Sequence, residues 1–402
     1  MAASLKPAYL VEAVRSPIGK HRGALATVRA DDLAALMIEA LRSRAPALGA
    51  RIDHVVFGAT NQAGEDNRNV GRMAALLAGL PYEVPALTVN RLCGSGLEAV
   101  CDAVRRIATG DADCVIAGGV ESMTRAPFVF GKSDEAFPRT APKVFDTSLG
   151  WRFENPKMAA RFPLQSMGET AENVAEKWKI SREEQDAFAL SSHEKALRAI
   201  NDSAFDGEIV PVAIPQKKGD PVVVSKDESP RTDASLAALA KLAPVFRKNG
   251  SVTAGNSSPL NDGASGVLVV SEDVLKAEKL EPLARIVATA TAGVEPNTMG
   301  EGPIPAGKKA LGRAGWKIND VDRVELNEAF AAQSIACMRG LELDPARVNV
   351  RGGAIALGHP IGSSGCRVLV TLLHIMKAEQ LKRGMAALCI GVGQGIAMCV
   401  ER

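Results

Sequence analysis

Two cysteines and one histidine lie in three glycine-rich stretches that are far apart in the chain. The stretches are NRLCGSG around Cys93, GGAIALGHP with His359, and CIGVGQG starting at Cys389. A thiolate is a strong nucleophile, and an imidazole can take a proton from a thiol. Glycines let the backbone come close to a bound substrate. Together these features predict one active site that acts on a thioester.

Cys93 follows a strand-like segment, residues 87–89, and precedes a helical run at residues 97–107. A thiol at a helix N-terminus faces the positive end of the helix dipole, which favours the thiolate. Gly94 and Gly96 leave room for a substrate carbonyl. By itself, a cysteine between glycines is more often a structural residue, so the neighbouring residues decide its role.

His359 lies in a Gly-His-Pro sequence, where the proline restricts the backbone that follows. The near-neutral pKa of an imidazole suits it to accept the proton of a thiol. The other histidines (His21, His54, His193 and His374) have no comparable surroundings, and we assign them to structural roles.

These three stretches, with a fourth, NEAF at residues 327–330, resemble the thiolases over essentially all 402 residues. The resemblance implies that Cys93 is the nucleophile and His359 the base. It makes Cys389 the acid and base for the acetyl-CoA carbon. It also implies that the N–H groups of Cys93 and Gly391 form an oxyanion hole, and that Asn327 holds a water which forms a second hole with His359.

The same resemblance implies which residues contact coenzyme A (CoA). Ser258, in the segment TAGNSS, matches a serine that touches the pantetheine, and Arg231 matches a residue lying against the adenine. Met167 and Met299 resemble residues of the pocket wall, although filling of the core explains both methionines equally well. Glu328 is expected to orient the reactive groups rather than react.

Composition limits the remaining possibilities. The chain has 46% apolar and 23% charged residues, and its net charge of +2 gives no reason to expect nucleic acid or a membrane as partner. Seven cysteines without a Cys-x-x-Cys pair or a secretory signal predict a cytoplasmic protein without disulfides or a metal site. The P-loop-like spacing at residues 302–309 lacks the final Ser or Thr, so no cofactor is expected beyond CoA as a substrate.

Strands alternate with helices in both halves of the chain, which predicts an α/β fold. Strands are expected at residues 9–14, 54–58, 114–118 and 386–390, and a Gly/Ser turn at 363–365 before a helix at 368–379. This faint internal repeat fits the duplicated five-layer αβαβα sandwich that the thiolase resemblance implies. The expected division is residues 1–121 with 251–275, a loop domain covering CoA at 122–250, and a second half at 276–402.

Further sequence features resemble the degradative thiolases that cleave 3-oxoadipyl-CoA in aromatic catabolism. Ser166 stands where many biosynthetic acetoacetyl-CoA thiolases have histidine. Arg351, where most relatives have Asn, could disturb the site or bind an acidic substrate tail. The alternatives are a biosynthetic acetyl-CoA C-acetyltransferase, a condensing synthase of the same fold and a non-catalytic acyl-CoA-binding relative. The resemblance also implies a homodimer or homotetramer.

Overall fold

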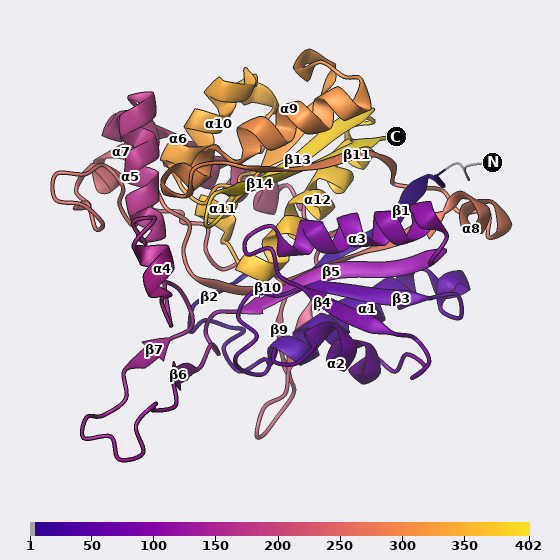
Figure 1. The fold of residues 1–402 in the computed structure, drawn as a ribbon. Coiled ribbons are helices and arrows are strands. Elements are labelled where there is room, and N and C mark those ends of the chain that lie inside the picture. Colours follow the sequence, from indigo (N-terminus) through magenta and orange to yellow (C-terminus); the bar gives the residue numbers. More distant parts are fainter. Residues whose placement is uncertain (1–4) are drawn as a thin grey trace.

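Two sets of strands with the same order form the centre of the fold in the computed structural model, which describes residues 5–402 (Figure 1). Residues 1–4, part of the segment in which we saw no secretory signal, lie outside the described residues. The first set, in spatial order, is β4 (Ala86–Val89), β3 (His54–Gly58), β5 (Cys114–Ser122), β10 (Asn261–Ser271) and β1 (Ala8–Arg15). The second set is β12 (Arg323–Leu326), β13 (Arg383–Ile390), β14 (Gln394–Glu401) and β11 (Ala284–Gly293).

The pairing directions repeat between the two sets and confirm the predicted duplication. β3 runs parallel to β5 as β12 runs parallel to β13, and the next two pairs are antiparallel in both sets. Val348 pairs in parallel with Val324, at the place where β4 pairs with β3. One feature was not predicted: β1 pairs with β11 at Ala8–Leu10, so the two half-sheets are hydrogen-bonded to each other. The short β2 (Gly19–Lys20) pairs with the start of β10.

Helices complete five layers (Figure 1). The outer layers hold α1 (Ala30–Arg44) and α2 (Val70–Leu77) on one side, and α9 (Pro303–Ala314) and α10 (Ala331–Leu341) on the other. The central layer holds α3 (Ser95–Thr109) and α12 (Ile361–Ala378). Alternation along β3 shows the layering, because Val55 and Phe57 pack in the outer core while Val56 packs with α3 and α12. Shorter helices are α8 (Glu272–Ala277), α11 (Ala354–Leu357), η1 (Pro46–Leu48), η2 (Pro296–Glu301), η3 (Ile318–Asp320) and η4 (Pro345–Arg347).

The two central helices approach each other at glycine backbones. A Cβ at Gly96 of α3 would lie 2.7 Å from the Cys366 amide and 2.9 Å from the Gly362 carbonyl of α12. Our prediction of a turn at residues 363–365 is therefore wrong, because these small residues lie inside α12, which starts at Ile361. They serve helix packing rather than chain reversal. The contact sets the N-termini of α3 and α12 close together, and Cys93 and His359 lie just before them.

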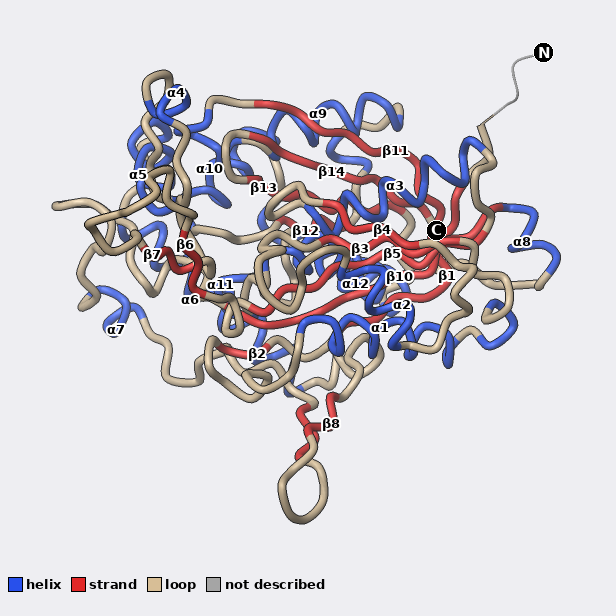
Figure 2. Tube along the Cα trace, turned by 60° about the horizontal axis from the view of Figure 1, so that its bottom comes forward, coloured by secondary structure: helices blue, strands red, loops and turns tan. Residues whose placement is uncertain are grey.

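Between β5 and β10 the chain adds further elements at the periphery of the sandwich (Figure 1). They are the hairpin of β6 (Phe128–Phe130) and β7 (Val144–Asp146), α4 (Pro156–Ala159), α5 (Met167–Trp178), α6 (Arg182–Asn201), the hairpin of β8 (Val212–Ile214) and β9 (Val222–Val224), and α7 (Leu236–Ala240). α4 to α7 lie on one side, and the β8–β9 hairpin packs on the core that contains α1. Figure 2 shows the hairpin that begins with β8 projecting from the body. No helix within residues 5–402 is long and apolar enough to cross a membrane.

The helix contact predicts opposite effects for two glycine substitutions. Gly96→Ala places a methyl against backbone atoms of α12 and should lower the free energy of unfolding by about 1–3 kcal/mol. Gly312→Ala, in α9 with open space around it, should raise the free energy of unfolding by about 0.5–1 kcal/mol. Urea-induced unfolding of both variants measures the difference. A Gly96→Ala variant as stable as the unmodified protein would contradict the close contact.

Candidate active site

Cys93 lies in a fixed turn between β4 and α3. The Leu92 amide donates to the Asn90 side chain at 2.9 Å, and the Ser95 hydroxyl donates to the Leu92 carbonyl at 2.6 Å. Leu92 has a φ of +46°, in the left-handed region that residues other than glycine rarely adopt. The turn therefore holds Cys93 in one place immediately before the helix.

Cys389 and Gly391 lie at the end of β13 and face the Cys93 turn. The amides of Gly391 and of Cys93 itself both point toward the Cys93 thiol, and each lowers the pKa of that thiol. The charge of Cys93 raises the pKa of Cys389, because the two thiols are neighbours. Val392, next to Gly391, is a β-branched residue with a φ of +64°, a strained conformation of the kind that persists at functional sites. The structure thus brings Cys93, Cys389 and Gly391 together.

Burial changes the protonation that we expected from the sequence. It raises the pKa of Cys93 despite the helix N-terminus and the two amides, and it raises the pKa of Cys389 well above its usual value. It also lowers the pKa of His359 to about 3. The near-neutral pKa that we expected for His359 is therefore wrong, and at Cys93 the effect of burial outweighs that of the helix N-terminus. Desolvation disfavours every charged form here, so a neutral thiol and a neutral imidazole are the resting pair.

Hydrogen bonds fix the tautomer of His359. Its Nδ1 lies 2.6 Å from the Ser364 hydroxyl, which itself donates to the Pro360 carbonyl at 2.9 Å. Because that hydroxyl uses its proton on Pro360, Nδ1 must be the donor, and Nε2 keeps its lone pair. Nε2 lies 3.5 Å from the Asn327 Nδ2. The Oδ1 of Asn327 is buried and has no hydrogen-bond partner among residues 5–402.

Glu328 is buried and joins three segments around the site. Its carboxylate accepts hydrogen bonds from the Ser192 hydroxyl at 2.7 Å, the Asn349 side chain at 2.8 Å and the Ile355 amide at 3.1 Å. Gly353 leaves the space that the carboxylate fills. Glu328 therefore ties the loop carrying Asn327 to the loop carrying His359 and to α6, which fits the orienting role expected for it.

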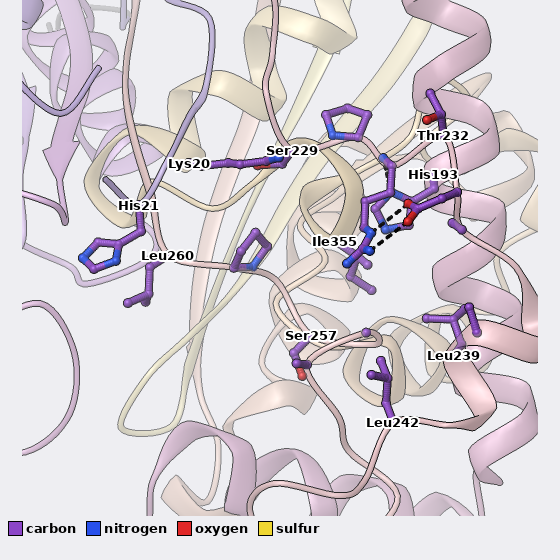
Figure 3. Close-up of a pocket in the computed structure, with 18 residues that line it drawn as sticks. Lys20, His21, His193, Ser229, Thr232, Leu239, Leu242, Ser257, Leu260 and Ile355 are labelled. Atoms are coloured by element: carbon purple, nitrogen blue, oxygen red, sulfur yellow. Dashed lines mark hydrogen bonds and ion pairs between the residues drawn. The ribbon is translucent and has the colours of Figure 1, made fainter. Parts of the chain in front are cut away.

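A pocket of about 790 Å³ lies between residues 122–250 and the sandwich (Figure 3). Arg231, for which we predict a contact with the adenine of CoA, lines this pocket with its guanidinium paired to Asp233 at 3.2 Å. Its amide donates to Nδ1 of His193, also at 3.2 Å. Ser257 lines the same wall, whereas the next residue, Ser258, donates its amide to the Ala329 carbonyl at 3.0 Å.

The two methionines lie at the thiol end of the site. Met299 is buried in an apolar cluster with Cys389 and Phe330, and Met167 packs against that cluster. A Cβ at Gly391 would be 3.5 Å from the Met167 sulfur. Both methionines thus fill space beside Cys389 and Gly391. This position agrees with core filling and with a place in the pocket wall.

Sequence reasoning missed several residues of the site. Lys20 and His21 line the large pocket on the side away from His193 (Figure 3), and three successive basic residues at 20–22 were the available signal. Ser364, the partner of His359, carried no signal because we expected a turn there. Arg351 donates to the Ala204 carbonyl at 2.6 Å and is not part of the pocket wall, which favours a structural role for it.

Among residues 5–402, no group of three or more Cys, His, Asp or Glu side chains is arranged as metal ligands. The reactive groups in this part of the chain are thiols, an imidazole, amides and a carboxylate, and this set suits acyl transfer through a cysteine thioester.

Family models identify the two halves. Residues 8–273 match the thiolase N-terminal domain, and residues 280–402 match the thiolase C-terminal domain. The chain belongs to the thiolase family. The enzyme is therefore an acyltransferase.

Named relatives match this thiolase over its whole length. It is 54% identical to a beta-ketoadipyl-CoA thiolase of Acinetobacter baylyi, over 99% of this chain and 100% of the relative. It is 53% identical to the 3-oxoadipyl-CoA/3-oxo-5,6-dehydrosuberyl-CoA thiolase of Escherichia coli, with the same coverage. The crystal structure of the Bacillus anthracis acetyl-CoA acetyltransferase is similar with a TM-score of 0.94, at 41% identity over 99% of both chains.

The depressed pKa of His359 predicts a pH dependence of stability. Its pKa is about 3 in the folded thiolase and near 6.5 when exposed, so between these values only the unfolded chain binds the proton. Stability must then fall as the pH decreases through this window. Relative to His359→Asn, which cannot titrate, the unmodified enzyme should lose about 2 kcal/mol between pH 6.5 and 4.5.

Urea-induced unfolding of both proteins at pH 6.5, 5.5 and 4.5 tests this prediction, because all other titrating groups are common to the pair. Parallel pH profiles for the two proteins would show that His359 titrates normally in the folded state.

Proposed function

We propose that this thiolase cleaves 3-oxoacyl-CoA with CoA to give acetyl-CoA and a shortened acyl-CoA, and that it prefers 3-oxoadipyl-CoA. The observation that carries the proposal is the meeting of the Cys93 thiol, the Gly391 amide and the Cys389 thiol. The two relatives at 54% and 53% identity support the choice of acyl chain, because their names specify it. Two basic residues in the pocket wall, Lys20 and His21, favour anionic ligands.

The first half of the proposed reaction forms the acyl-enzyme. Nε2 of His359 takes the proton of Cys93, and the thiolate attacks the carbon of the 3-oxo group. The resulting oxyanion accepts hydrogen bonds from the amides of Cys93 and Gly391. Its collapse breaks the bond between carbons 2 and 3, leaving the acyl group on Cys93 and the enolate of acetyl-CoA.

The enolate is then stabilised and protonated. A water held by Asn327 fits the buried Oδ1 of that side chain, and this water and His359 donate to the enolate oxygen. Cys389 gives its proton to the enolate carbon, and acetyl-CoA leaves. The raised pKa of Cys389 supports this role, because it keeps the thiol protonated until a strong base forms beside it.

The second half returns every group to its first state. The Cys389 thiolate takes the proton of the incoming CoA thiol, and the CoA thiolate attacks the acyl-Cys93 thioester. Cys93 leaves as a thiolate and regains its proton from the His359 imidazolium. Ser258, Arg231, Met167 and Met299 are proposed to contact the CoA and acyl parts of the substrate; the position of Arg231 in the pocket wall and of Met167 beside Gly391 supports this.

A second candidate is the synthesis of acetoacetyl-CoA from two molecules of acetyl-CoA, since every step above is reversible. The similarity to an acetyl-CoA acetyltransferase, at 41% identity over the whole chain, favours it. In that direction Cys389 would remove a proton from the methyl group of the second acetyl-CoA.

The domain division and the assembly belong to the same proposal. Residues 1–121 with 251–275 would form one half, 276–402 the other, and 122–250 a loop domain that covers CoA. We propose a cytoplasmic homodimer or homotetramer. The exposed apolar side chains of α2 (Met73, Leu76 and Leu77) beside β4, the last strand of the sheet, support self-association, because an uncovered sheet edge is a ready pairing surface.

A thiolysis assay with free CoA tests the proposed function on 3-oxoadipyl-CoA, a medium-chain 3-oxoacyl-CoA and acetoacetyl-CoA, with Cys93→Ser as the blank. We expect kcat/KM to be highest for 3-oxoadipyl-CoA, by about tenfold, which is 1.4 kcal/mol in transition-state stabilisation. Highest activity with acetoacetyl-CoA would favour the second candidate. If none of the three substrates were turned over, the proposed thiolase activity would be contradicted, and a role in binding acyl-CoA without catalysis would be favoured.

A further inference from the structure

Asn261, the first residue of β10, is completely buried and uses its whole amide group. Its Oδ1 accepts the backbone N–H of His359 at 2.9 Å. Its Nδ2 donates to the Gly19 carbonyl at 2.9 Å and to the Ser229 hydroxyl at 3.1 Å. One side chain therefore joins three segments that are far apart in the sequence, and one of them carries the histidine.

The chain before His359 is shaped to fit this side chain. Gly358 has a φ of +115°, and a Cβ there would lie 2.5 Å from the Asn261 side chain. The contact is thus steric as well as polar, because Asn261 occupies the space that any other residue at 358 would need. Together with the hydrogen bond to the His359 amide, this contact fixes the backbone from which the imidazole projects.

The other two partners of Asn261 lie at or next to the wall of the large pocket. Ser229 lines the pocket, and Gly19 is followed by Lys20, which also lines it (Figure 3). Hydrogen bonds next to Ser229 and Gly19 in the chain stabilise this wall. Asp227 accepts two hydrogen bonds from buried Arg15, at 2.7 and 2.9 Å, and one from the Ile18 amide at 2.8 Å. A buried, charge-assisted anchor of this kind resists displacement.

We propose that Asn261 is a positioning residue that holds His359 in register with the wall of the CoA pocket. Its Oδ1 holds the His359 backbone amide, and its Nδ2 binds Gly19 and Ser229. The position of His359 is thereby fixed relative to those two residues. The proposal rests on His359 being the base for Cys93, and it does not depend on which acyl chain is preferred.

The test follows the reaction of Cys93 with iodoacetamide in the free enzyme, which reports deprotonation of the thiol without any substrate. Asn261→Ala should slow this alkylation about tenfold and lower kcat about 10- to 100-fold, because a displacement of about 1 Å at a reacting group has effects of this size. Asn261→Asp keeps an oxygen facing the His359 amide but loses the donor to Gly19 and Ser229, so its alkylation rate should lie between those of Asn261→Ala and the unmodified enzyme. Ser229→Ala removes one of the two acceptors of the Asn261 Nδ2 but leaves the bond from Oδ1 to the His359 amide, so it should raise the KM for CoA and slow alkylation less than Asn261→Ala does.

Two further variants separate the possible outcomes. Val55→Ala, in the outer core away from the site, should lower stability but leave the alkylation rate of the folded enzyme unchanged. His359→Ala should slow alkylation at least as much as Asn261→Ala. Normal alkylation in Asn261→Ala with slow alkylation in His359→Ala would overturn the positioning role. Normal alkylation in both would instead overturn the role of His359 in the proposed function.

Discussion

The contact between the two central helices at glycine backbones positions the two loops that carry the proposed catalytic groups. α3 and α12 touch where Gly96 faces the backbone of Gly362 and Cys366. Each helix begins two residues after a reactive side chain, Cys93 in the first half and His359 in the second. The duplication therefore supplies two equivalent loops, and the glycine contact brings the starts of the two helices, where these loops end, close together. Larger residues at this contact would push the two loops apart.

Burial is the second constraint, and it sets the chemistry of these groups. An exposed Cys–His pair at a helix N-terminus would tend toward thiolate and imidazolium, but here desolvation raises the pKa of the thiol and lowers that of the imidazole. The neutral pair therefore predominates at rest, and the amides that point at the thiol stabilise the negative charge when it forms. The same desolvation keeps Cys389 protonated, so it can act as an acid toward an enolate carbon. Two thiols in one site can therefore serve different steps.

The sequence was sufficient to predict those residues of the site whose immediate neighbours in the chain form a recognisable motif. The glycine-rich stretches around Cys93, His359 and Cys389 and the alternation of strands and helices led to the fold and to the groups that the structure brings together. The sequence was not sufficient where contacts with distant segments determine the conformation, the pKa or the role of a residue. The small residues at 363–365 suggest a turn until α3 is packed against them. The pKa of His359 depends on burial by other layers, and Asn261 is an ordinary polar residue until Gly19, Ser229 and His359 surround it.

The central claim is that Cys93 carries the acyl group, whereas Cys389 only moves a proton from the CoA thiol to the enolate carbon. When no enolate forms, His359 alone can pass the proton between Cys93 and CoA. The direct measurement is exchange of labelled CoA into the shortened acyl-CoA, which needs acyl transfer but no carbon–carbon bond cleavage. Cys389→Ala should lose thiolysis by about 10²- to 10⁴-fold while keeping most of the exchange, and Cys93→Ala should lose both. Equal loss of exchange and thiolysis in Cys389→Ala would contradict the division of roles between the two thiols.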